Sequence, residues 1–316
     1  MSLREVAFLY PGQGSQAPGM LGALPNSRAA QQMIEEAADT VGGIDDLDSA
    51  AELESTTNSQ LALLICGVAA ARTFVQDYQV SPGFVAGHSV GAFAAAVTAG
   101  VLSFPEALTA VHLRGELMSR ACASGQWGMA AVIGLRLPAV RDLLDAVDAD
   151  SDHLWIANLN SADQVVLGGT AAALDMARQA AQRAGARSFQ ILDVHVASHG
   201  PVQCGTARAL AAHLASIPAR NQTAAYFTNV GARRIRDDPR AVLDDLAASV
   251  ARPVRWYDIA RVLPEYGVTA AVQMPPGHVL SHLMSAAAPG LASFSVADHG
   301  FATISRREID RLVVPL

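Results

Sequence analysis

The sequence predicts an α/β fold, with a large domain built on a parallel-type sheet and a smaller domain inserted into it. Short apolar runs typical of buried strands alternate with helical patterns in both outer parts of the chain, and this alternation favours parallel strands. Between about residues 127 and 194 the predicted order becomes β-α-β-β-α-β, which is the ferredoxin-like unit. The chain has 316 residues, 51% hydrophobic and 16% charged, and can bury a large core.

The first part of the large domain begins with an apolar strand that Pro11 and Gly12 end. Ser103 and Glu106 have the spacing of a capping box, which predicts that a helix begins there. The elements predicted in this part are strands at 6–10 and 84–87 and helices at 27–41, 58–78, 91–99 and 104–123.

The inserted unit and the second part of the large domain follow. In the unit we predict strands at 129–134, 154–159, 165–168 and 188–194, with helices at 138–147 and 171–184. After it we predict strands at 224–228, 269–274 and 293–297 and helices at 201–217, 242–250, 256–266 and 277–287. The predicted domains are therefore 1–126 joined with 195–316, and 127–194.

Composition excludes several classes of protein. The net charge of −7 argues against non-specific binding to nucleic acid. Cys66, Cys122 and Cys204 are scattered, which indicates neither a disulfide framework nor a zinc site, so we predict no metal. The beginning of the sequence has no apolar signal-peptide region, and the longest apolar runs, 61–71 and 92–102, are too short to span a bilayer. We therefore expect a cytoplasmic protein without a membrane partner.

The most informative stretch is Gly87-His88-Ser89-Val90-Gly91, which has the G-x-S-x-G pattern of a nucleophile elbow. It lies between an apolar strand pattern and a run of small residues that suits a closely packed helix. Glycines on both sides of Ser89 are expected, because side chains there would collide with the strand and the helix. Backbone N–H groups at the helix start can stabilise an oxyanion. The alternative is a glycine-rich turn without chemistry.

A serine nucleophile needs a general base, and the chain has nine histidines. His195 and His199 follow a predicted strand, where α/β enzymes present catalytic groups. Asp298-His299 matches the late Asp-and-His order of an α/β-hydrolase. His278 and His282 are weaker candidates. The residues by themselves leave His199 and His299 as alternatives.

Motifs along nearly the whole chain resemble those of the malonyl-CoA:acyl-carrier-protein transacylases. The matching motifs are Pro11-Gly12-Gln13-Gly14-Ser15-Gln16, Gln60-Leu61-Ala62-Leu63, Gly87-His88-Ser89-Val90-Gly91, Arg114-Gly115-x-x-Met118, Asn160-x-x-x-Gln164-Val165-Val166, Ser198-His199-x-Pro201, Pro253-Val254-x-Trp256 and Pro276-Gly277-x-Val279-Leu280. The resemblance implies an α/β-hydrolase-like domain with a ferredoxin-like insertion. It implies an S-malonyltransferase that uses malonyl-CoA and the prosthetic-group thiol of an acyl carrier protein, with no bound cofactor.

The resemblance also implies the roles of individual residues. Ser89 is expected to be the nucleophile and His199 the general base and acid, oriented by the backbone carbonyl of Arg255. Gln13 and the backbone N–H of Val90 are expected to form the oxyanion hole. Arg114 is expected to bind the free carboxylate of the malonyl group, because its planar fork matches a carboxylate. Gln60 and Asn160 are expected to shape the pocket, although local turn or cap roles fit these two residues equally well.

Two departures from the usual motifs favour one branch of this family. Ala92-Phe93 follows the elbow where the transacylases of fatty-acid synthesis usually carry an acid, and Ser198-His199-Gly200-Pro201 replaces the usual F-H-S-P. The first departure resembles the epsilon subunit of malonate decarboxylase, whose acceptor is that enzyme's own carrier subunit. The sequence-based hypothesis is therefore this subunit. The alternatives are a transacylase of fatty-acid or polyketide synthesis, and a serine hydrolase.

Overall fold

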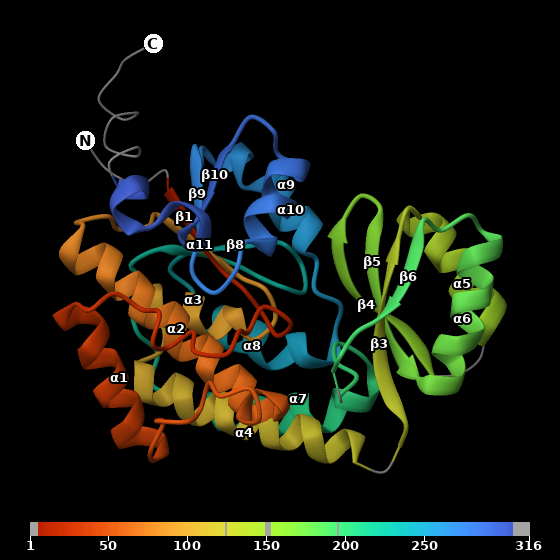
Figure 1. The fold of residues 1–316 in the computed structure, drawn as a ribbon, viewed down its shortest axis with the longest axis horizontal. Coiled ribbons are helices and arrows are strands. Elements are labelled where there is room, and N and C mark those ends of the chain that lie inside the picture. The colour runs from red at the N-terminus through yellow and green to blue at the C-terminus, as the bar shows by residue number, and fades with distance from the viewer. Residues whose placement is uncertain (1–5, 124, 149–152, 195, 306–316) are drawn as a thin grey trace.

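A computed structural model describes residues 6–123, 125–148, 153–194 and 196–305, which contain two separate sheets (Figure 1). The larger sheet has the strand order β10-β9-β1-β2-β7-β8. Every pair in it is parallel except β7 and β8. Its strands are β1 (Val6–Tyr10), β2 (Phe84–Gly87), β7 (Ala225–Phe227), β8 (Arg234–Ile235), β9 (Ala270–Gln273) and β10 (Ala292–Ser295).

Helices cover both faces of the larger sheet. Successive side chains of a strand point to opposite faces, and in this sheet the side chains on both faces are apolar and buried. The helices of this part are α1 (Arg28–Val41), α2 (Thr56–Asp77), α3 (Gly91–Thr98), α4 (Phe104–Cys122), α7 (Cys204–Ala215), α8 (Pro239–Ala248), α9 (Trp256–Val262), α10 (Val279–Ala287) and α11 (Val296–His299). Phe8 and Tyr10 of β1 pack with α2, α3 and α4, whereas Ala7 and Leu9 pack with α9 and α10. The predicted capping box at Ser103 and Glu106 is present at the start of α4.

The smaller sheet is antiparallel, with the order β4-β5-β3-β6. Along the chain its elements are β3 (Trp127–Ile133), α5 (Leu137–Asp148), β4 (Leu154–Ser161), β5 (Gln164–Thr170), α6 (Ala171–Arg183) and β6 (Ser188–Ile191). This is the predicted β-α-β-β-α-β order, with α5 and α6 packed on one face. The predicted α/β fold class, a parallel-type sheet with a second small sheet, is confirmed.

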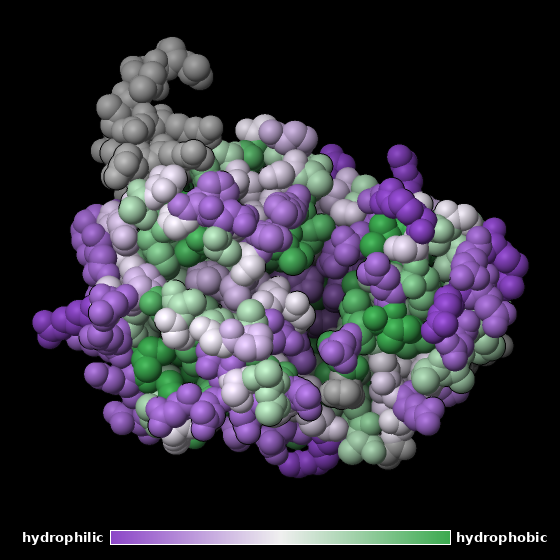
Figure 2. Space-filling model, in the orientation of Figure 1, coloured by the Kyte–Doolittle hydropathy of each residue, from purple (hydrophilic) through white to green (hydrophobic). Residues whose placement is uncertain are grey.

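Backbone hydrogen bonds join strand β4 of the smaller sheet to the segment that precedes α9 in the larger part. The N–H of Leu159 in β4 donates to the carbonyl of Val254, and the N–H of Val254 donates to Ala157. Figure 2 shows the molecular surface hollowed between the larger and the smaller part. The division into 1–126 with 195–316 and 127–194 remains a prediction.

Several predicted elements end elsewhere. The strand predicted to reach residue 194 ends at Ile191, and the one predicted at 293–297 gives way after Ser295 to α11, which the Ser295 side chain caps. The two-residue strand β8 and short 3-10 turns at Glu52–Glu54, Pro201–Gln203, Ser249–Ala251 and Pro264–Tyr266 were too short for hydrophobic periodicity to indicate.

Helix α2 (Thr56–Asp77) is longer than the apolar run 61–71 that the sequence shows within it. Among the described residues it is the one helix long and apolar enough to cross a membrane, but 83% of its most apolar window is buried inside the protein. It packs in the largest core cluster against β1 and α3. Its apolar character is therefore accounted for by its place in the core.

Candidate active site

The elbow has the strained geometry that its glycines predict. Ser89 has a φ of 54° at the turn between β2 and α3. A Cβ on Gly87 would overlap the backbone of Gly91, and a Cβ on Gly91 would overlap the carbonyl of Tyr10. Side chains at both positions are therefore sterically excluded, and the serine is held at the carboxyl edge of the sheet.

Ser89 and His199 share this left-handed conformation. Five described non-glycine residues have positive φ, and these two are among them, with His199 at 61°. Such conformations cost about 1–3 kcal/mol each and persist where surrounding structure imposes them. Their presence at both members of the predicted catalytic pair is consistent with a functional site.

Asn229, which sequence analysis missed, fixes the elbow. It follows β7, and its side-chain Oδ1 accepts a hydrogen bond from the Ser89 N–H at 2.9 Å while its Nδ2 donates to the Gly87 carbonyl at 2.9 Å. The side chain is fully buried. A polar residue at the carboxyl end of a predicted strand, in line with the elbow, was the signal that could have indicated it.

A buried carboxylate in turn positions Asn229. Asp245 of α8 accepts hydrogen bonds from the Tyr226 hydroxyl at 2.8 Å and from the N–H groups of Asn229 at 2.9 Å and Val230 at 3.1 Å. Burial raises the pKa of the Asp245 carboxyl above its usual value. Three donors satisfy this group inside the core, so it anchors the strand end that carries Asn229.

Replacing Asn229 with alanine is expected to slow acylation of Ser89 by about 10- to 100-fold, because it removes both bonds that hold the elbow backbone. Since Asn229 binds the backbone around Ser89, the predicted nucleophile, rather than substrate, kcat should fall while KM stays nearly constant. Single-turnover acylation and steady-state kinetics measure this. A matched variant, Asn26→Ala, alters an exposed asparagine whose side-chain oxygen accepts a hydrogen bond from Gln31. A raised KM with unchanged kcat would contradict the positioning role.

Arg114 of α4 is a buried cation directed at Ser89, the predicted nucleophile. Its Nη1 donates to the Gln60 Oε1 at 2.6 Å and its Nη2 donates to the Ser89 Oγ at 3.0 Å. The side chain is 1% exposed, its Nε has no hydrogen-bond partner, and no carboxylate pairs with it among the described residues. Burial lowers the pKa of Arg114 to about 10, so it stays charged at neutral pH.

His199 is a buried, neutral imidazole. Its Nδ1 lies 2.6 Å from the Ser249 carbonyl, an acceptor that requires the proton on Nδ1 and leaves the lone pair on Nε2. Burial, together with the charges of Arg114 and His88, lowers the pKa of His199 to about 3. No hydrogen bond joins His199 to Ser89 within the described ranges.

The carbonyl that orients His199 is not the predicted one. Arg255 was expected to provide it, but the 3-10 turn Ser249–Ala251 brings the Ser249 carbonyl onto the imidazole. The same turn also binds the histidine's backbone, because the His199 N–H donates to the Val250 carbonyl. Arg255 instead donates its N–H to Asn229, and its side chain pairs with Asp258.

The remaining predicted residues lie around this centre. Gln13, after β1, accepts a 3.4 Å hydrogen bond from the Gln60 amide, and Gln60 is fully buried. Val90 caps α3, and its N–H is not used by any hydrogen bond among the described residues. Asn160, at the end of β4, contacts the Nε2 of His88 at 3.1 Å. His88, which precedes Ser89, is thus held by the smaller sheet.

The departure at Gly200 has a steric reason. A Cβ there would overlap the indole of Trp155, whose Nε1 donates to the Ser198 carbonyl at 3.0 Å. The indole occupies the space that a larger residue after His199 would need. Ala92, the other departure, is fully buried in α3.

His299, the alternative base, lies elsewhere. Its Nδ1 is 3.1 Å from the carbonyl of Ser295 at the end of β10, and its ring packs against Phe294. His195 lies outside the described residues. Of the two candidate bases, it is His199 whose pKa is affected by the charge of Arg114. Since Arg114 donates to Ser89, the structure places His199, and not His299, near the elbow.

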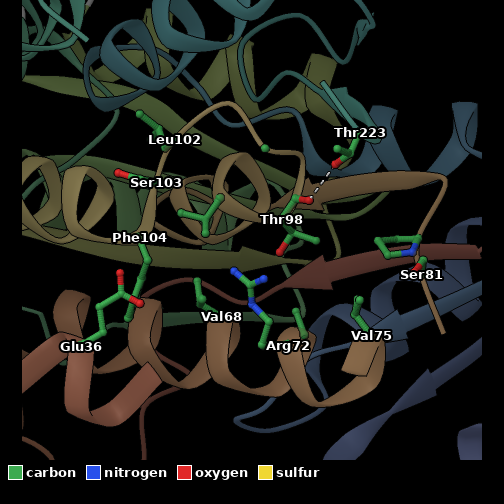
Figure 3. Close-up of a pocket in the computed structure, with 14 residues that line it drawn as sticks. Glu36, Val68, Arg72, Val75, Ser81, Thr98, Leu102, Ser103, Phe104 and Thr223 are labelled. Atoms are coloured by element: carbon green, nitrogen blue, oxygen red, sulfur yellow. Dashed lines mark hydrogen bonds between the residues drawn. The ribbon is translucent and has the colours of Figure 1, made fainter. Parts of the chain in front are cut away.

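A cavity of about 540 Å³ lies beside α2 and α3, at the end of β2 that is remote from the elbow (Figure 3). It is lined by Ser81 and Pro82, which precede β2, and by Thr98, which ends α3. Ser89 lies at the opposite end of both elements. None of the predicted site residues lines this cavity, so it is separate from the site around Ser89.

The fold and the elbow define an α/β enzyme of the acyltransferase class. The chain belongs to the family described as "Acyl transferase domain", whose model matches residues 7–298. It is 32% identical over 301 residues to a malonyl CoA-acyl carrier protein transacylase of Bacillus subtilis, covering 94% of each chain. It is 34% identical over 298 residues to the polyketide biosynthesis protein ThaF of Burkholderia thailandensis, of which it covers 25%.

Solved structures agree. A crystal structure of an acyl-carrier-protein S-malonyltransferase from Burkholderia pseudomallei superposes with a TM-score of 0.90 at 31% identity, covering 96% of this chain and 99% of the other. A malonyl-transacylase in complex with a type II polyketide acyl-carrier protein has a TM-score of 0.87 at 32% identity, covering 93% of this chain and 95% of the other.

Proposed function

We propose that this enzyme transfers a malonyl group from malonyl-CoA, through an ester on Ser89, to the prosthetic-group thiol of an acyl carrier protein. One observation carries the substrate assignment. Arg114 is a buried, charged guanidinium that donates to the Ser89 Oγ, and no carboxylate in the described part of the chain pairs with it. A buried cation without a counterion is costly, and a substrate carboxylate supplies the missing partner.

In the first half-reaction the malonyl carboxylate pairs with Arg114 and thereby places the thioester carbonyl beside Ser89. The Oγ attacks the carbonyl carbon while its proton passes to Nε2 of His199, the nitrogen that the Ser249 bond leaves free. The N–H groups of Val90 and Gln13 stabilise the oxyanion. The C–S bond then breaks, and coenzyme A leaves as a thiol with the proton from His199.

The second half-reaction reverses these steps with a new thiol. The carrier's thiol gives its proton to His199 and attacks the malonyl-serine carbonyl, and Ser89 leaves with the proton restored. Acetyl-CoA fits this site poorly, because it lacks the carboxylate and leaves Arg114 unpaired.

The same arrangement couples substrate charge to the base. In the free enzyme the charge of Arg114 helps to lower the pKa of His199. A bound carboxylate offsets that charge, so the imidazole becomes a stronger base once malonyl-CoA is in place.

This coupling predicts a distinctive pH profile. With a pKa of about 3, His199 in the free enzyme stays neutral at pH 5, where an imidazole of ordinary pKa, about 6.5, would be roughly 3% neutral. The pH dependence of kcat/KM for malonyl transfer, which reports the free enzyme, should therefore show no loss between pH 7 and pH 5. The kcat profile reports the enzyme–substrate complex, in which His199 is the stronger base. As the pH is lowered, kcat should therefore begin to fall at a higher pH than kcat/KM does. A kcat/KM profile that falls with an apparent pKa near 6.5 would contradict the account.

The carrier is a further part of the proposal. The relatives reported above are transacylases and a polyketide biosynthesis protein, and one of them is complexed with an acyl-carrier protein. They support a carrier of fatty-acid or polyketide synthesis, which sequence analysis had placed second, rather than its first choice, the malonate decarboxylase epsilon subunit. The feature that favours the decarboxylase carrier is Ala92-Phe93 after the elbow.

Labelling distinguishes these carriers. The purified enzyme is incubated with radiolabelled malonyl-CoA and either an acyl carrier protein of fatty-acid synthesis or the malonate decarboxylase carrier subunit. We expect label on the first carrier at a rate at least about tenfold above the second. Label on the decarboxylase carrier alone would reverse the assignment. Release of malonate to water without either carrier, at the rate of CoA release, would indicate a serine hydrolase.

A further inference from the structure

An exposed cluster of metal-ligating side chains lies apart from the residues assigned to acyl transfer. His278 and His282 are one helical turn apart at the start of α10, where the His282 N–H donates to the His278 carbonyl. Asp298 lies in α11, the short helix that directly follows β10, and its side chain is next to the two histidines. One ligand atom from each residue lies within 4.8 Å of the others, and all three side chains are exposed.

The two imidazoles are arranged side by side. Their ring centroids are 4.4 Å apart with an interplanar angle of 29°, so their edges face similar directions. Histidines four positions apart on a helix can bind one ion together, because side chains at this spacing share a face. This pair therefore supplies two nitrogen ligands without a change of backbone.

The carboxylate is held in place by a second contact. Asp298 Oδ1 lies 3.1 Å from His278 Nδ1, and Asp298 Oδ2 accepts a hydrogen bond from the Ser295 hydroxyl at 2.7 Å. Outer contacts of this kind fix the orientation of ligating groups in metal sites.

We propose that His278, His282 and Asp298 form a surface site for a divalent ion of the zinc class. Two imidazole nitrogens and one carboxylate oxygen suit Zn²⁺ or Co²⁺, and they disfavour Mg²⁺ and Ca²⁺, which take oxygen ligands. Water completes the coordination. The ion replaces the His278–Asp298 hydrogen bond and links α10 to α11. The inference is independent of the proposed malonyl transfer.

Binding of Co²⁺ tests the site, because Co²⁺ substitutes for Zn²⁺ and has visible absorption bands. The full-length protein is prepared without a histidine tag and titrated with CoCl₂. We expect saturation at one equivalent, displacement of Co²⁺ by ZnCl₂, and a rise in Tm with ZnCl₂ that MgCl₂ does not produce. No saturable binding to the folded protein would overturn the proposal.

Variants assign the ligands. His282→Asn and Asp298→Asn should each weaken Co²⁺ binding by at least about tenfold. His112→Asn, which alters an exposed histidine of α4 outside the cluster, should leave binding unchanged. Circular dichroism of each variant without metal shows whether it is folded. Unchanged Co²⁺ affinity in folded His282→Asn or folded Asp298→Asn would contradict this ligand set.

Discussion

Ser89→Ala is expected to abolish labelling of the protein by malonyl-CoA and to lower malonyl transfer by at least about 10⁴-fold. The reason is chemical, since the ester intermediate has no other oxygen at the elbow to form on. Intact-protein mass spectrometry after brief exposure to malonyl-CoA measures the adduct. Ser81→Ala, at the remote cavity, is the matched control and should label like the unmodified chain.

A second substitution separates chemistry from folding. Ser89→Gly also removes the hydroxyl, but glycine adopts a φ of 54° without strain. We therefore expect Ser89→Gly to unfold at a temperature at or above that of Ser89→Ala while remaining equally inactive. Residual labelling in either variant would contradict Ser89 as the nucleophile.

Arg114→Met is expected to reverse the selection between acyl groups. Loss of a buried charge-assisted pair with the malonyl carboxylate costs about 2–5 kcal/mol, or roughly 30- to 5000-fold in kcat/KM for malonyl-CoA, with little effect on acetyl-CoA. Competition between the two thioesters, read as the ratio of acyl groups on Ser89, measures this. Arg72→Met, at the remote cavity, is the control.

The same substitution should not weaken the folded state. Arg114 is 1% exposed and carries a charge that no carboxylate of the described chain offsets, so a methionine of similar length relieves a desolvation cost. The Tm of Arg114→Met is expected to be at or above that of the unmodified chain, measured without substrate. A large loss of stability together with an unchanged preference for malonyl-CoA would show that Arg114 serves the fold instead.

Local patterns predicted much of this fold. The strand at Val6–Tyr10 has the predicted bounds, and the capping box at Ser103 is formed. The elbow followed from Gly87 and Gly91, because the excluded side chains are a property of the turn itself. Elements of two to four residues, such as β8 and α11, carry too little periodicity for such prediction.

Contacts between distant parts of the chain were beyond the sequence patterns. Asn229 lies 140 residues from Ser89, and a single asparagine after a strand does not indicate which backbone groups it binds. The carbonyl that orients His199 belongs to Ser249, in a short 3-10 turn that has no recognisable sequence pattern. The expectation that Arg255 provides this carbonyl was therefore wrong. Backbone acceptors have no residue type to recognise.

Peptide mapping of the acylated protein tests the central claim most directly. The unmodified chain is exposed briefly to an equal mixture of malonyl-CoA and acetyl-CoA, quenched in acid, digested and analysed by tandem mass spectrometry. The account predicts one acylated residue, Ser89, carrying malonyl and almost no acetyl. Equal amounts of the two acyl groups on Ser89, or a malonyl group on another residue, would contradict the account.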